Sequence, residues 1–220
     1  MRAAWIALAL LAMPLSACGP APSPSASPSD AAAPDSGTVA KQPFLLRFTR
    51  EPATVAGLSR LEDAELAPGA TEIRVWIGFG LRIDQQVLIL STSPGGHVKG
   101  SALIHFDDDD DDEYVAALLR QCDAPRRDMG MVVCDAPLST PTDWGAIHAR
   151  LRQLGIETLP DESAMPTESL VTDGTSMVVE VANAEGYRAY AWSNPDQRSE
   201  PQAQVAAEIM QVVENVFEGR

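Results

Sequence analysis

Short stretches in which apolar residues alternate with other residues recur along this chain. Residues 73–79 alternate in this way and residues 86–90 form an apolar run, as strands of a sheet do. Because Pro94-Gly95-Gly96 follows, we expect the chain to turn and return antiparallel through residues 97–106. The same pattern predicts further strands at residues 44–48, 131–134, 176–181 and 187–192, the last two joined by a turn at 183–186.

Apolar residues three or four positions apart mark two longer helices. The first is expected to be capped by Thr140, with Pro141 in its first turn and Asp143 completing a capping box, and to end at Gly155. The second covers residues 201–217. Their apolar faces consist of Trp144, Ile147, Leu151 and Leu154, and of Val205, Ile209, Val212, Val216 and Phe217. The predicted fold is α+β, an antiparallel sheet with two main helices packed on one face.

The N-terminus carries a pattern of another kind. Arg2 precedes an apolar run, residues 3–15, which is shorter than the roughly 20 residues of a membrane-spanning helix. The run ends at Leu15-Ser16-Ala17-Cys18, which resembles the lipobox of bacterial lipoproteins: Leu, two small residues, then Cys. The resemblance implies that residues 1–17 are a signal peptide removed before Cys18 and that Cys18 carries lipid. Two or more acyl chains on one residue anchor a protein stably in a membrane.

The segment after the lipobox has the composition of a linker. Of residues 19–38, Pro, Ser and Ala supply five each, with no apolar periodicity that would build a core. We therefore divide the chain into the signal peptide, a lipidated Cys with its linker at 18–40, and one globular domain at 41–220. Residue 19 is Gly rather than Asp, which by analogy with lipoprotein sorting in enteric bacteria favours the outer membrane.

Acidic residues outnumber basic ones by 31 to 16, so the formal charge is −15. Residues 1–17 contain one basic and no acidic side chain, and their removal leaves −15 − 1 = −16. This charge argues against binding to nucleic acid or docking on anionic lipid. It suits solubility in general, or a basic protein partner.

Two cysteines remain once Cys18 is lipidated. In an oxidising compartment Cys122 and Cys134 are expected to form a disulfide. Free thiols are one alternative, and a zinc site with histidine ligands is another. The spacing of the two cysteines is not the short gap typical of zinc sites, so no metal or cofactor is predicted.

A contiguous acidic run is the most conspicuous motif of the domain, and it leads into a short helix expected over Tyr114–Arg120. A solvated, self-repelling loop is one interpretation, weak calcium binding is a second, and a docking patch for a basic partner is a third. The run consists of Asp107, Asp108, Asp109, Asp110, Asp111, Asp112 and Glu113.

Motifs for catalysis are missing from the sequence. It contains no Gly-x-Ser-x-Gly, no His-Glu-x-x-His and no phosphate-binding loop. His97, His105 and His148 are each interpreted as ordinary surface or core residues. Asp161-Glu162-Ser163 offers carboxylates beside a hydroxyl, although adjacent loop carboxylates are usually surface residues.

Residues 173–195 loosely resemble stretches of uncharacterised bacterial envelope lipoproteins, a resemblance that brings no known activity. Within them, Glu180, Arg188 and the tyrosines are hypothesised to line one exposed face of the sheet. The predicted function is that of a membrane-anchored, non-enzymatic binding or accessory domain. The alternatives are an immunity or inhibitor lipoprotein that neutralises a basic toxin or wall hydrolase, and a small periplasmic hydrolase.

Overall fold

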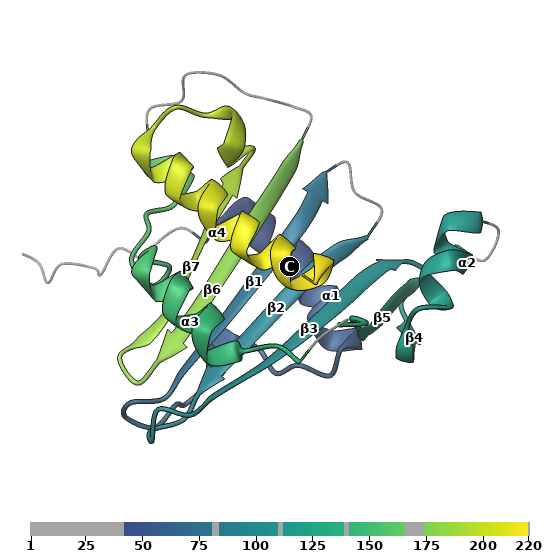
Figure 1. Ribbon diagram of the computed structural model, residues 1–220, viewed down its shortest axis with the longest axis horizontal. Coiled ribbons are helices and arrows are strands. Elements are labelled where there is room, and N and C mark those ends of the chain that lie inside the picture. The colour runs from purple at the N-terminus through teal and green to yellow at the C-terminus, as the bar shows by residue number, and fades with distance from the viewer. Residues whose placement is uncertain (1–41, 81–83, 110–111, 139–140, 166–173, 220) are drawn as a thin grey trace, which may run out of the picture. The chain divides into compact units, whose positions relative to one another are not determined.

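The computed structural model describes residues 42–80, 84–109, 112–138, 141–165 and 174–219. Seven strands form one sheet in the order β4-β5-β3-β2-β1-β6-β7, and every neighbouring pair is antiparallel (Figure 1). The strands are β1 (Thr71–Gly80), β2 (Gln85–Thr92), β3 (Val98–Asp107), β4 (Asp123–Asp128), β5 (Met131–Asp135), β6 (Thr175–Asn183) and β7 (Gly186–Ser193). The predicted α+β class is confirmed.

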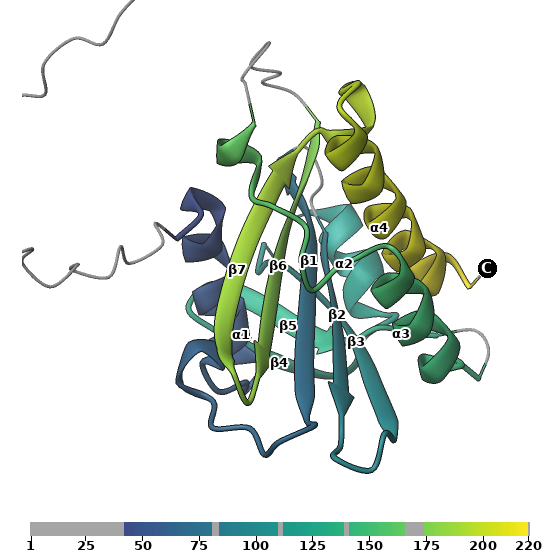
Figure 2. The same ribbon diagram turned by 90° about the vertical axis from the view of Figure 1, so that its left-hand side faces the viewer.

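Two helices, α3 (Trp144–Gln153) and α4 (Pro201–Glu218), cover one face of the sheet, as predicted (Figure 2). Side chains at every second position of a strand, such as Val75 and Ile77 of β1, form the main core with these two helices. The buried face of α4 is centred slightly away from the expected stripe. It buries Ala203, Ala206, Ile209, Met210, Val213 and Val216, while Val205, Val212 and Phe217 pack at its margin.

The opposite face of the sheet is covered by the segment that precedes β1. It contains the 3-10 helix η1 (Phe44–Thr49), the helix α1 (Arg50–Val55) and the 3-10 turn η2 (Leu61–Asp63). The strand predicted at 44–48 is therefore wrong. Leu46 and Thr49, three positions apart, are the buried residues of η1, so burial follows the period of a 3-10 helix rather than that of a strand.

The far end of the sheet has its own small core. The helix α2 (Glu113–Leu119) packs beside β3 and β5, and Cys122 lies against that cluster. Cys122 and Cys134 are joined in a disulfide, as predicted. Closing a loop of this length stabilises the fold by about 3 kcal/mol. The sequence did not predict β4, whose six residues are all exposed.

The start of α3 differs from the expected capping box. Asp143 is the N-cap and accepts a hydrogen bond from the backbone N–H of Ala146, so the helix begins at Trp144. Thr140 lies outside the described residues. The helix ends just before Gly155, as predicted. Gly155 adopts a φ of 74°, which residues other than glycine tolerate poorly.

The edge strand β7 is closed by carboxylates rather than by another strand. Asp161 accepts a hydrogen bond from the N–H of Ala191, and Glu162 accepts one from the N–H of Ser193. The paired carboxylates considered for catalysis thus satisfy edge donors that would otherwise invite another strand. No helix among the described residues is long and apolar enough to cross a membrane.

Candidate functional site

Two hollows flank the segment of residues 43–58 where it crosses the sheet. Both open on the sheet face opposite α3 and α4. One is a groove of about 850 Å³ towards the ends of β1 and β3, and the other is a pocket of about 240 Å³ towards β6 and β7. We call them the groove and the polar pocket.

The groove has an apolar wall and a polar lip. Its apolar lining comes from Leu45, Phe48, Phe79, Phe106 and Met131. The rings of Phe48 and Phe79 lie side by side, tilted by 41°, with their centroids 6.5 Å apart. Arg47, Glu51, Gln85, His105 and Asp107 supply the polar lining.

His105 is a buried titratable residue in the wall of this groove. Only 3% of its surface is exposed, and its ring meets the Trp76 indole edge to face with centroids 6.2 Å apart. None of the described residues forms a hydrogen bond with its Nε2. Burial lowers the pKa of His105 to about 4, because the charged imidazolium loses its hydration. The side chain is therefore neutral at pH 7.

The acidic run starts at the lip of the groove, and its described residues have different roles: groove lining, an ion pair and a helix cap. Asp107 is the last residue of β3 and lines the groove, whereas Asp108 pairs with Arg127 at 3.3 Å. Asp112 caps α2 by accepting hydrogen bonds from the N–H groups of Tyr114 and Val115. Asp110 and Asp111 lie outside the described residues.

An exposed aromatic group borders the same lip. The guanidinium of Arg47 lies over the Phe44 ring at 3.6 Å and over the Phe48 ring at 4.6 Å. Phe44 is 65% exposed and Phe48 is 45% exposed. Stacks of Arg on aromatic rings are typical of binding surfaces.

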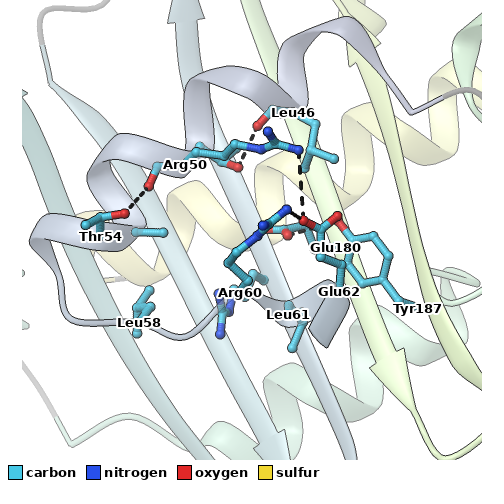
Figure 3. A pocket seen from close by; sticks show the side chains of 12 residues that line it. Leu46, Arg50, Thr54, Leu58, Arg60, Leu61, Glu62, Glu180 and Tyr187 are labelled. Atoms are coloured by element: carbon cyan, nitrogen blue, oxygen red, sulfur yellow. Dashed lines mark hydrogen bonds and ion pairs between the residues drawn. The ribbon is translucent and has the colours of Figure 1, made fainter. Parts of the chain in front are cut away.

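The polar pocket lies under the same segment, on its other flank (Figure 3). Its floor is formed by Arg74 on β1, Glu180 on β6 and Tyr187 on β7. Glu180 accepts hydrogen bonds from the Trp76 indole N–H at 2.7 Å and from the Tyr187 hydroxyl at 3.0 Å. Burial, and then the charge of Glu180, raise the pKa of Tyr187, so its hydroxyl stays protonated and donates.

This geometry corrects one hypothesis from the sequence. Glu180 and Arg188 lie on opposite faces of the sheet, because Glu180 opposes Ala189 and Val181 opposes Arg188 in the β6–β7 register. Tyr187 and Tyr190 are likewise on opposite faces. Glu180 is only 6% exposed, so no single exposed face joins these residues.

Other candidates from the sequence lie elsewhere. His97 is exposed in the β2–β3 turn, and the His148 Nε2 lies 3.3 Å from the Thr92 hydroxyl on the α3 side. Among the described residues, no three His, Cys, Asp or Glu side chains are grouped as metal ligands would be. Cys18 lies outside the described residues.

Sequence reasoning missed the arginines of the polar pocket, Arg50, Arg60 and Arg74. Arg50 and Arg60 precede β1, in a segment where the sequence shows no site motif. Arg74 alternates with apolar neighbours, a pattern typical of a solvent-exposed face of a sheet, yet only 3% of its surface is exposed. The apolar residues Trp76, Val87 and Val178 on that same face were the available signal that the face is covered.

Comparison with known proteins returned neither a matching family model nor a matching curated protein.

Proposed function

We propose that this chain is a lipid-anchored envelope protein whose domain binds a basic polypeptide segment in the groove. The observation that carries the proposal is the position of Asp107, which places the start of the acidic run on the lip of an apolar groove. Binding rather than catalysis is proposed because the sequence shows no nucleophile motif and His105, in the groove wall, is only 3% exposed.

Carboxylates outnumber guanidinium groups around the lip, where Arg47 also lines the groove and Arg127 pairs with Asp108, and this excess suggests the kind of partner. Asp84, Asp107, Asp108, Asp109, Asp112 and Glu113 lie on the chain segments that meet at this corner, and the Tyr114 hydroxyl ties α2 to Asp84 at 3.1 Å. Lys and Arg side chains on a partner would complement these carboxylates and speed its association. The apolar wall in turn fits one large apolar side chain between such basic residues.

The anchor is proposed from the sequence. Leu15-Ser16-Ala17-Cys18 supports lipidation at Cys18, and the linker at 18–40 would let the domain stand off the membrane. Residue 19 is Gly and not the Asp that retains lipoproteins of enteric bacteria at the inner membrane, which favours the outer membrane. Labelling of the full chain with palmitate in bacteria, and loss of the label in Cys18→Ala, tests the anchor; equal labelling of both would overturn it.

Binding is tested on the full chain, purified in detergent, with fluorescent ten-residue peptides. The probes carry one central Trp flanked by Lys, by Ser or by Glu. The Lys peptide should bind most tightly, and its affinity should fall as NaCl is raised. Phe48→Ala should weaken binding about tenfold by removing a groove wall, and Asp107→Asn should weaken it less and reduce the salt dependence.

Matched controls come from residues away from the groove. His97→Ala removes an exposed ring in the β2–β3 turn, and Glu185→Gln removes an exposed carboxylate at the β6–β7 turn. Both should bind the Lys peptide as the unaltered chain does. Equal affinity for all three peptides, independent of salt, would show that the groove does not select a basic partner.

A further inference from the structure

Buried polar residues on the groove-bearing face mark a second site. Thr49, Arg74 and Glu180 are at most 6% exposed, and all three line the polar pocket. Burying charged groups costs several kcal/mol each, and their mutual attraction often does not recover that cost. Such a group beside a cavity is therefore a candidate for binding rather than for stability alone.

Glu180 supplies the negative end of the pocket, because Arg74, which shares the floor, is paired with Glu72. Arg74 is held by Glu72 through its Nε at 2.8 Å and its Nη2 at 2.7 Å, and it donates to the Ser59 carbonyl through Nη1. Glu180 receives one hydrogen bond on each oxygen, from Trp76 and Tyr187. Because a carboxylate offers about four acceptor positions, Glu180 retains capacity for a further donor.

The mouth of the pocket presents a positive end. Arg50 and Arg60 both reach Glu62, Arg60 in a close ion pair and Arg50 with its Nη2 at 3.9 Å from the Glu62 Oε1 (Figure 3). Their side chains are 55% and 61% exposed. Arg60 also lies 3.7 Å from Asp63. A guanidinium has five N–H donors, so Arg50 and Arg60 together still retain donors for a further anion.

Between these ends the walls are aliphatic. Leu46, Ala53, Leu58 and Leu61 line the cavity, whose volume is about 240 Å³. At roughly 30 Å³ for each water in the liquid, that space corresponds to about eight water molecules, or a solute of about eight to ten heavy atoms.

We propose that the polar pocket binds a small zwitterion of amino-acid size, with its ammonium group on Glu180 and its carboxylate on Arg50 and Arg60. The aliphatic walls hold the body of the ligand. This site is separate from the groove, so it does not depend on the basic partner proposed above.

The test is calorimetric titration of the full chain in detergent with each of the twenty standard amino acids. The best binder is then compared with its N-acetyl and amide derivatives, which remove the positive and the negative end respectively. Each derivative should bind at least tenfold more weakly. Glu180→Gln should abolish the preference for the free amine over the N-acetyl form, and Arg50→Ala with Arg60→Ala should abolish the preference for the acid over the amide.

Arg152→Ala is the matched control, because that side chain is 58% exposed but lies on α3, over the opposite face. It should leave all affinities unchanged, and the thermal melting of each variant checks that it folds. The proposal is overturned if no amino acid binds at a concentration of about 10 mM, because a specific site would have a dissociation constant far below that. It is also overturned if a derivative binds as well as its parent.

Discussion

At the scale of single residues, the groove-bearing face holds polar side chains in an apolar setting. His105 shows the consequence most directly, because its pKa is lowered to about 4 by burial, whereas an unfolded chain titrates it near 6.5. Between these two values the unfolded state binds more protons than the folded state. As far as His105 is concerned, the free energy of unfolding is therefore greatest above pH 6.5 and falls as the pH drops towards 4.

The expected effect can be separated from that of other groups with one variant. At about 1.36 kcal/mol per pKa unit, His105 should account for a loss of about 2.5 kcal/mol in the free energy of unfolding between pH 7.5 and pH 4.5. His105→Gln should remove this part of the pH dependence, measured by urea denaturation at both pH values. His97→Gln, at an exposed position, should retain it. An identical pH dependence in His105→Gln and the unaltered chain would refute the assignment.

Residue patterns could predict some polar residues and not others. The partnership of Cys122 with Cys134 followed from counting cysteines, since no other pairing was open once Cys18 was set aside. The burial of Arg74 and Glu180 was missed, because alternation along a strand identifies its two faces, and only apolar neighbours such as Trp76 indicated that the second face is also covered. Covering that face depends on a distant segment, residues 43–63.

At the scale of elements, α3 packs on the sheet through a contact between Trp144 and Gly100 that leaves no room for a side chain at residue 100. The Trp144 ring packs so closely over Gly100 of β3 that a Cβ at this position would overlap the ring. Trp144 is the first residue of α3 and packs against the main core. The position of the helix on β3 therefore depends on the absence of a side chain at residue 100.

Gly100→Ala should force Trp144 aside and lower the free energy of unfolding by about 1–3 kcal/mol, as overpacking does. Urea denaturation measures the loss, and a second change, Trp144→Leu, should recover part of it by removing the ring. Gly95→Ala is the control, because its Cβ would lie 3.7 Å from the nearest atom, in ordinary contact. It should change stability by less than about 0.5 kcal/mol. Equal stability of both alanine variants would show that the Trp144 contact is not tight.

Element predictions succeeded where local pattern and tertiary setting agree. Strands β1, β2, β3, β6 and β7 lie close to their predicted positions because turns such as Pro94-Gly95-Gly96 separate clear apolar runs. The strand predicted at 44–48 is wrong because a five-residue stretch with four apolar residues is compatible with either a strand or a helical turn. Strand β4 has no apolar pattern, since it pairs at an exposed edge and is rich in charge.

At the scale of the whole molecule, the fold carries a large excess of negative charge. The whole chain has 16 basic and 31 acidic side chains, of which Arg2, Lys41, Asp30 and Asp35 precede residue 42. Residues 42–220 therefore hold 14 basic and 29 acidic side chains, a net charge of 14 − 29 = −15. The arginines of local ion pairs, such as Arg74 with Glu72 and Arg198 with Glu200, are already counted in this net charge. The compact state therefore bears a net self-repulsion that the expanded chain relieves.

Salt screens charges over about 10 Å at 0.1 M, a distance spanned by many carboxylate pairs on a domain of this size. Raising NaCl from about 10 mM to about 300 mM at pH 7.5 should therefore stabilise the protein. Relief of about 1 kcal/mol would raise the melting temperature by about 2–4 °C. Sucrose at matched osmolarity, which does not screen charge, separates screening from general solute effects. A melting temperature that falls with NaCl would instead mean that the arginine ion pairs outweigh the net repulsion, and the charge of the domain would then be a poor guide to its partner.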